Sequence, residues 1–530
     1  MSKYQSELVQ WFESLFHFQF DAILYSSSLI KSLQRVIRYV LKNGQYKKGI
    51  IYIPTDFDPN IKLELFSTIS NIKFEHVPTD SVYEDMIDLK QLEELIQRDS
   101  NEGQVYPLMV IANAGSNLLG RCDQLTKIKK LCEDKQIWLH VIGDLLGSLA
   151  LLSAERTNLK VSCDSLTIDT IKLFGIQNLP HLTFYFRSQT INETNSLHEY
   201  ILQSSSIHFL SLWSLTQRCK TETIIEHMKH SFDLTKIFIQ RLKQIPTVSI
   251  VNQDQNEEFN TYQRICSNEN LNELLPKSVV IFRFYSDQVT TKVFYSYIDL
   301  LNLWLFDKFS QQYPKMNLEL LKSLNFQPNN QHSLAVHAIR FAPLEHLLDV
   351  VEQSDIDIFC DDLQRYCDIM VATLTARLNL DAIVAKHENL VSISVSNWAG
   401  IGAVRYIPST ISSAELNETS AYEINAIQAE LARNLQTNDS AFSLGGGTDE
   451  EDSMFYLRLG MIRKPEDLDI LLQKISVTGN ETELSLKYVE DMAGKIKNGI
   501  ERAQQDLYNE NLNLLAQDGL LRQLPVVSSR

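Results

Sequence analysis

The first 180 residues alternate short apolar runs with segments whose apolar residues recur at helical spacing. Leu29, Leu33, Val36 and Val40 fall on one face of a helix that would follow the apolar run 22–25. The same pattern predicts strands at 22–25, 49–53, 72–77, 107–112, 137–141 and 165–168, and helices at 89–97 and 124–135. Continuous apolar strands separated by helices indicate an α/β domain with a mostly parallel sheet between helices.

The pattern changes after a long helical stretch at about 211–244. Strands at 248–251, 279–285, 334–341 and 390–395 and helices at 295–312 and 344–378 predict a smaller α+β domain. A helix at 422–435 and a strand at 454–462 extend it, and residues from about 481 are helical again. We therefore predict a large domain at 1–245, a smaller α+β domain at 246–475 and a C-terminal helical tail at 476–530.

Charge restricts the classes of partner. The 530 residues contain 49 Lys and Arg against 66 Asp and Glu, which gives a formal net charge of −17. Nucleic acids and anionic membrane surfaces attract clustered cations, and the sequence has no Lys/Arg block. It also has no apolar run near the roughly 20 residues that span a bilayer, and its polar start does not resemble a signal peptide. The expected partner is a small molecule.

Cysteine usage suggests a compartment. The seven cysteines are scattered and include no C-x-x-C pair. This pattern argues against a disulfide framework and a structural zinc site, and it fits a reducing environment. We predict a cytoplasmic protein without a metal site.

Ligands of open α/β sheets bind beyond the carboxyl ends of the strands, so the turns there are the first candidates. Ser26, Ser27 and Ser28 follow the first strand at a helix start, where hydroxyls and free backbone N–H groups can hold a phosphate. The alternative is that one serine only caps the helix. Taken alone, the cap is the better interpretation.

Three further turns or strand ends carry candidate groups. Gly115 and Ser116 lie in a loop of small residues that would let a ring approach the backbone, although such a loop alone proves nothing. His140 lies near the end of its strand, where a structural role is the more common one. Lys172 follows a buried strand that ends at Asp169. Apolar neighbours would desolvate its ammonium and favour the neutral amine that Schiff-base chemistry needs, unless it is an ordinary solvated lysine.

The order of these features resembles the group II pyridoxal-phosphate-dependent decarboxylases. Residues 111–123, I-A-N-A-G-S-N-L-L-G-R-C-D, are similar to the family pattern A-T-A-G-T-T-x-x-G-x-x-D. Residues 138–141, W-L-H-V, are similar to its strand W-L/M-H-V-D-A-A. Residues 164–173, D-S-L-T-I-D-T-I-K-L, are similar to D-S-x-T-x-D-P-H-K-L, whose lysine forms the aldimine with the cofactor.

The resemblance implies a type I pyridoxal-phosphate-dependent transferase-like fold, with residues 1–245 as a shortened cofactor-binding domain. It implies pyridoxal 5'-phosphate as cofactor and Lys172 as the catalytic residue that forms the aldimine. By the same resemblance, the remaining cofactor-binding residues are Ser26, Ser27, Ser28, Gly115, Ser116, His140, Asp144 and Asp169. The substrate would be an amino acid or a related small carboxylate, and a homodimer is the family's usual assembly.

Three departures from the family pattern concern activity more than fold. The aspartate that keeps the ring nitrogen protonated is replaced by Ile142, which removes support for the electron sink. Asp144 points the same way if the strand continues, but it would lie roughly 7 Å further along. Ile171 replaces the histidine before the lysine, and Asp58 lies near the position of the ring-stacking histidine. Only about 25 residues precede Ser26, fewer than in typical members.

Two functions therefore stay open at this stage. Retention of Lys172 favours a carboxy-lyase that removes a carboxylate from its substrate, and Ile142 favours a catalytically degenerate member that acts as a scaffold or regulatory binding protein. A third and remote alternative is an unrelated α/β ligand-binding protein in which the lysine motif arose by chance.

Overall fold

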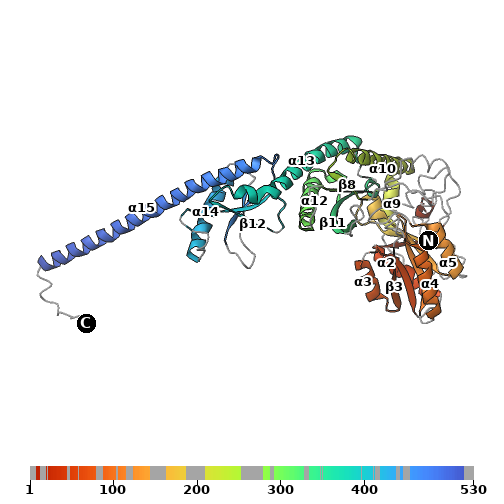
Figure 1. The fold of residues 1–530 in the computed structure, drawn as a ribbon. Coiled ribbons are helices and arrows are strands. Elements are labelled where there is room, and N and C mark those ends of the chain that lie inside the picture. The colour runs from red at the N-terminus through yellow and green to blue at the C-terminus, as the bar shows by residue number, and fades with distance from the viewer. Residues whose placement is uncertain are drawn as a thin grey trace, which may run out of the picture. The chain divides into compact units, whose positions relative to one another are not determined.

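A computed structural model provides the fold, and it divides the chain into two compact units, residues 1–364 and 365–530 (Figure 1). The structure describes residues 7–11, 20, 22–43, 48–55, 57, 59–78, 87–102, 105–114, 123–143, 163–186, 209–251, 279–286, 292–326, 334–346, 348, 350–395, 397–409, 411, 418–436, 442–445 and 454–517. The statements below concern these residues.

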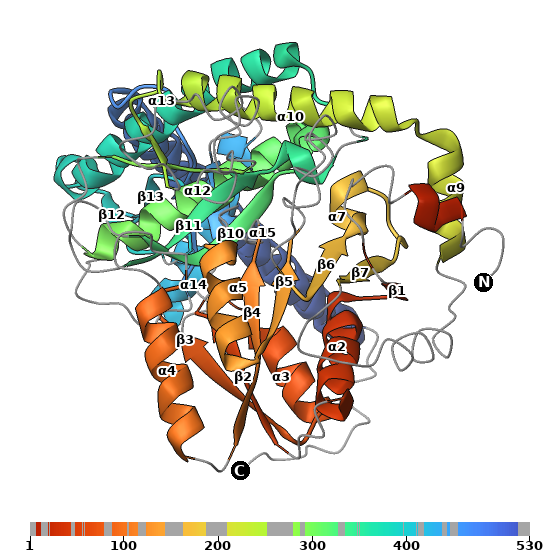
Figure 2. The ribbon, with the colours of Figure 1, turned by 90° about the vertical axis from the view of Figure 1, so that its right-hand side faces the viewer.

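The first unit is built on a seven-stranded sheet with the order β1-β7-β6-β5-β4-β2-β3. Its strands are β1 (Ala22–Ser26), β2 (Gly49–Pro54), β3 (Ile72–Val77), β4 (Tyr106–Asn113), β5 (Trp138–Ile142), β6 (Ser165–Asp169) and β7 (His181–Tyr185). Strands β2 to β6 pair in parallel, whereas β7 runs antiparallel to both β6 and β1. The carboxyl ends of β1 to β6 therefore share one edge of the sheet (Figure 2).

Helices cover both faces of this sheet. The helices before and between its strands are α2 (Leu29–Asn43), α3 (Pro59–Thr68), α4 (Leu89–Glu102), α5 (Leu125–Lys135) and α7 (Thr170–Phe174). Alternate side chains of β5 separate the two cores, as strand geometry requires. Leu139 and Val141 pack with α4 and α5, whereas Trp138 and Ile142 pack with α2 and α3.

A second, smaller sheet completes the first unit. Two helices lead to it, α9 (Phe209–Arg218) and α10 (Thr221–Leu242). Its strand order is β10-β11-β9-β8, all antiparallel, with β8 (Val248–Ile250), β9 (Val280–Phe284), β10 (Glu319–Phe326) and β11 (Leu334–Phe341). The other elements here are α12 (Lys292–Gln312), the 3-10 helices η1 (Pro314–Met316) and η3 (Pro343–Glu345), and α13 (Gln353–Val384), which continues into the second unit.

The second unit has its own antiparallel sheet, β12-β13-β15-β14. Its elements are β12 (Leu390–Ile393), β13 (Gly402–Tyr406), α14 (Glu418–Gln436), β14 (Phe442–Gly445), β15 (Tyr456–Leu459) and α15 (Asp467–Gln517). Helices α14 and α15 cover this sheet and close a separate apolar core. The 51-residue α15 then extends well past the sheet and α14 (Figure 1).

The predicted fold class is confirmed, because a large, mostly parallel sheet lies between helices and smaller α+β parts follow it. The three-domain division stays a prediction. The stretch 211–244 and the residues from about 481 to 517 are helical as predicted, but the first stretch is divided into two helices and α15 begins earlier, at Asp467. The helix expected from residue 344 begins only at Gln353. Strands β7, β10, β13 and β14 were not predicted, because each mixes polar with apolar residues. In the described part of the chain, no helix has both the length and the hydrophobicity needed to cross a membrane.

Candidate active site

The antiparallel strand β7 brings three polar side chains into register at one edge of the large sheet. Ser26 ends β1 and pairs with His181, the first residue of β7, which also pairs with Asp169 at the end of β6. Paired residues on neighbouring strands point to the same face. With strands about 4.8 Å apart, Ser26 and Asp169 lie roughly 10 Å from each other with His181 between them.

Asp169 organises the turn that carries Lys172. Its Oδ1 accepts hydrogen bonds from the backbone N–H groups of Ile171 (3.0 Å) and Lys172 (3.2 Å), which makes it the N-cap of α7. Its Oδ2 lies 3.4 Å from Nε2 of His181. Burial opposes ionisation of Asp169, but the hydrogen bond and charge of His181, with the Lys172 N–H, outweigh it and lower the pKa of the carboxyl.

His181 has one ring nitrogen without an assigned role. Its Nδ1 is buried and has no hydrogen-bond partner among the described residues. A buried polar atom without a partner is costly, so it indicates a place for a further polar group.

Lys172 is half-buried on the five-residue helix α7, which ends at Gly175 with a left-handed φ of 68°. At the end of α7, Phe174 forms a backbone bridge with His346, directly after η3. This bridge brings Glu345 toward Lys172. Burial tends to raise the pKa of Glu345, but the hydrogen bonds and charge of Arg340, and then the charge of Lys172, hold it below its usual range.

Glu345 belongs to a buried ion-pair network on β11 and η3. The Arg340 guanidinium is 1% exposed; it donates to Oε2 of Glu319 at 2.9 Å and to both carboxylate oxygens of Glu345. This bidentate contact between Arg340 and Glu345 fixes the orientation of the Glu345 carboxylate. The sequence analysis did not identify Arg340, Glu345 or His181, because their proximity to Lys172 arises only from tertiary pairing.

The three serines after β1 have different environments. Ser26 is 1% exposed, whereas Ser27 is exposed and Ser28 half-buried. Ser28 Oγ accepts a hydrogen bond from the Lys31 backbone N–H at 3.3 Å, as a helix cap does. Arg35 Nη1, a residue not identified from the sequence, donates to the Tyr25 carbonyl (2.8 Å) and lies 3.3 Å from Ser26 Oγ.

His140 is fully buried within the sheet. Its Nδ1 lies 2.7 Å from Oγ of Ser165, which also accepts a hydrogen bond from Trp138 Nε1 at 2.8 Å. Burial lowers the pKa of His140 to about 3, so the ring is neutral at physiological pH. Its Nε2 has no partner within the described ranges. A contact between His140 and a cofactor ring stays a prediction.

Ile142 lies next to His140 on the same face of β5 and belongs to the apolar core under α2. It is 8% exposed, so the position of the family's aspartate is filled by packed hydrocarbon. Gly143 follows, and a Cβ there would come within 2.8 Å of Ala114. Gly115, Ser116, Asp144 and Asp58 lie outside the described residues, and their predicted roles are neither supported nor opposed.

Two aspartates of the motifs quoted above hold backbone segments together, at opposite ends of the sheet. Asp123 accepts hydrogen bonds from the N–H groups of Ile87 (2.8 Å) and Asn113 (2.6 Å), which ties the segments at 87 and 123 to the end of β4. Asp164 accepts from the Leu139 N–H (2.8 Å) and from Lys129 Nζ (2.7 Å), which ties β6 to β5 and α5. Asp123 therefore supports the carboxyl edge of the sheet, whereas Asp164, which directly precedes β6, supports the opposite end of that strand.

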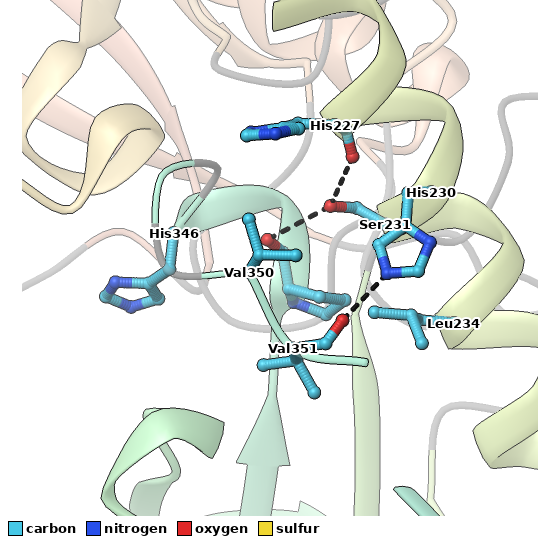
Figure 3. A pocket seen from close by; sticks show the side chains of 8 residues that line it. His227, His230, Ser231, Leu234, His346, Val350 and Val351 are labelled. Atoms are coloured by element: carbon cyan, nitrogen blue, oxygen red, sulfur yellow. Dashed lines mark hydrogen bonds between the residues drawn. The ribbon is translucent and has the colours of Figure 1, made fainter. Parts of the chain in front are cut away.

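A small pocket lies behind η3, between α10 and the segment that contains His346 (Figure 3). His230 Nε2 lies 2.7 Å from the Val351 carbonyl, and the Ser231 hydroxyl lies within hydrogen-bonding distance of the carbonyls of His227 and Pro343. These contacts use the polar groups for packing. In the described part of the chain, no cluster of His, Cys, Asp and Glu has the arrangement of a metal site.

Three family models together match most of the chain. Residues 50–258 match the pyridoxal-dependent decarboxylase conserved domain, residues 286–374 the PDXDC1-like central domain and residues 380–487 the PDXDC1-like second central domain. Pyridoxal-dependent decarboxylase domain-containing protein 1 of Mus musculus is 25% identical over 562 residues, covering 99% of this chain and 67% of that protein. The Danio rerio protein of the same name is 26% identical over 471 residues, covering 86% and 58%. This chain thus spans about three fifths of the length of these relatives.

Solved structures share the fold at low sequence identity. Mouse CSAD in its apo form has a TM-score of 0.51 at 14% identity, covering 68% of this chain and 75% of that chain. Oryza sativa TDC with PLP and tryptamine has a TM-score of 0.51 at 13% identity, covering 69% and 76%. At these identities the likeness concerns the fold alone.

Proposed function

Because the chain belongs to the pyridoxal-dependent decarboxylase family, we propose that it binds pyridoxal phosphate through Lys172 and acts as a carboxy-lyase-like protein on an amino acid or related carboxylate. The observation that carries the proposal is the placement of Lys172. It follows buried β6 on a turn capped by Asp169, at the edge where Ser26 and His181 meet.

The residues at this edge fit the cofactor in part. Lys172 supplies the amine for attachment, and Ser26, Arg35 and the start of α2 supply hydrogen-bond donors and positive charge for a phosphate. Nδ1 of His181, which has no hydrogen-bond partner among the described residues, offers one more polar contact. Ile142 does not fit a protonated ring nitrogen, because hydrocarbon provides no partner for a buried cation.

The chain's own residues would divide the work as follows. Pyridoxal phosphate, when bound, supplies the electron sink that stabilises a carbanion after carbon dioxide leaves. Asp169 holds the backbone of Lys172 in place and stays ionised against His181. Arg340 holds Glu345 on the side of α7, where its negative charge counterbalances the ammonium of Lys172.

Borohydride reduction tests the attachment. We expect the purified protein, supplied with pyridoxal phosphate, to absorb in the visible, and reduction to fix the cofactor on the peptide that contains Lys172. Lys172→Ala should abolish labelling, while the matched control Lys135→Ala, at an exposed lysine on α5, should leave it unchanged. A colourless protein, or labelling at another lysine, would overturn the assignment.

A second candidate function is favoured by the core position of Ile142. With hydrocarbon in place of the acidic partner, the chain would retain the fold and the attachment lysine while serving as a scaffold or regulatory binding protein. Measurement of carbon dioxide release from a panel of amino acids separates the two candidates. Turnover with any of them favours the carboxy-lyase, and cofactor labelling without turnover on any of them favours the scaffold.

A further inference from the structure

One apolar stripe runs along most of helix α15. Its first part packs on the unit's own core, with side chains that are buried or half-buried at spacings of three and four residues: Leu468, Leu472, Ile475, Gly479, Thr482 and Leu486. Gly479 lies against the ring of Tyr406 on β13, where an added Cβ would come within 2.4 Å. This face therefore rests on β13 up to about residue 486.

The same three-and-four spacing continues beyond the sheet. We call this continuation the exposed stripe, and its members are Val489, Ala493, Ile496, Ile500, Ala503, Leu507 and Leu514, with Glu510 at the remaining position. Every one is exposed; Ile496 is 59%, Ile500 54% and Leu507 63% accessible. No described element of the second unit covers them. Positions 489–514 span about 39 Å of helix, nearly four heptads.

A sustained 3-4 repeat of apolar residues is typical of a helix that packs against another helix. Gly494 and Gly499 lie within the stretch, and each weakens a helix that stands alone. A contiguous apolar surface of this length marks an interaction site rather than an ordinary solvated face.

We propose that the exposed stripe pairs with the same stripe of a second copy of this chain, as an antiparallel two-helix coiled coil. The available length supports this occupant. The unit's own sheet covers the face up to Leu486, so a partner helix must end near Val489. In an antiparallel pair with Leu514 of one copy opposite Val489 of the other, the helix of each copy ends near Val489 of its partner. A two-fold axis relates the two copies, so the same fit occurs at both ends of the interface.

The side chains agree with this alignment. It places Ile496 opposite Leu507 and Ile500 opposite Ala503, so that apolar layers meet throughout the centre. Glu510 then faces Ala493 of the second copy, and the two Glu510 carboxylates lie apart. Parallel pairing in register would instead bring them together in the seam, which like charges oppose.

Sedimentation of the full chain over a concentration series tests the surface. We expect the assembly to halve in mass in the double variant Ile496→Lys/Ile500→Lys, with helix content by circular dichroism preserved. Tyr508→Lys, which changes an equally exposed apolar residue outside the stripe, should keep the full mass. A monomeric parent chain, or an assembly that survives the double variant, would overturn the proposal.

Gln504 tests the orientation, because antiparallel pairing places it beside Lys497 of the second copy, whereas parallel pairing places it beside Gly499. We expect Gln504→Glu to associate about tenfold more tightly than Gln504→Lys at low salt, and the difference to vanish at high salt. Equal association of the two variants at low salt would contradict the antiparallel arrangement. None of these readouts depends on a cofactor, so the proposal can fail or succeed independently of the proposed function.

Discussion

Two neighbouring parts of the same sheet edge differ in chemistry. At the ends of β6 and β1 and the start of β7, Asp169, Ser26 and His181 face one another, and Lys172 follows directly. At the end of β5, the side chain is Ile142, packed in the apolar core under α2. The residues that the proposed function assigns to attachment and to anion binding are thus present, whereas position 142 carries no acidic side chain, and the two parts can be tested separately.

The largest effect is expected from Ile142→Asp. A carboxylate among hydrocarbon side chains should lower the free energy of unfolding of the unliganded protein by about 4 kcal/mol. If it meets a ring nitrogen when pyridoxal phosphate is added, the cofactor should restore much of the loss in a thermal melt and raise carbon dioxide release from some amino acid. Ile142→Ala, the control, should lose about 3 kcal/mol through its cavity without rescue. Equal cofactor stabilisation of both variants would contradict this interpretation of position 142.

A smaller loss is expected beside Lys172. Glu345→Gln removes the charge of the carboxylate that contacts both ends of the buried Arg340 guanidinium, and we expect about 3 kcal/mol less stability in urea unfolding. Glu319→Gln removes a pairing whose carboxylate is 46% exposed and should cost under about 1 kcal/mol. Urea unfolding should show a larger loss of stability for Glu345→Gln than for Glu319→Gln. The reverse order would mean that Glu345 is not the principal counter-ion of Arg340.

His140, on β5 two residues before Ile142, should make the free energy of unfolding depend on pH. Its pKa is about 3 in the folded chain and near 6.5 when unfolded, so between these values the unfolded chain binds the extra proton. The free energy of unfolding should therefore fall as pH falls from about 6.5 toward about 3, by up to about 1.4 kcal/mol per pH unit. His140→Gln should flatten this slope, whereas His76→Gln, at an exposed position, should leave it unchanged. The carboxylate of Asp169, whose pKa is lowered in the folded chain, is protonated only at more acidic pH, where its contribution to the free energy of unfolding is lost.

The smallest effect separates the two interpretations of the serines. Ser28→Ala removes a helix cap and should cost about 1 kcal/mol of stability without changing cofactor affinity. Ser26→Ala should weaken pyridoxal phosphate binding about tenfold, because its buried hydroxyl lies beside Arg35. Titration of both variants with pyridoxal phosphate separates the two interpretations. Equal affinities of the two variants for the cofactor would mean that the serines only cap the helix.

Much of the large sheet could be predicted from local patterns, because its strands are continuous apolar runs buried on both faces. Strand β7 escaped prediction, since His181 and Thr183 are polar but buried within it. This omission mattered, because β7 sets the register that joins Ser26 to Asp169. Arg35, Arg340 and Glu345 were likewise invisible, because no spacing in the sequence relates them to Lys172.

By itself, the sequence determined the class of sheet, the lysine motif after β6 and the substitution at position 142, since these depend on residue identity and short-range periodicity. Tertiary structure decided which polar groups surround Lys172 and which half of the apolar stripe on α15 packs on the core of its own unit. Antiparallel pairing and packing bring together residues that are far apart in the sequence, such as Lys172 and Glu345, which are 173 positions apart, and local preference carries no information over such separations.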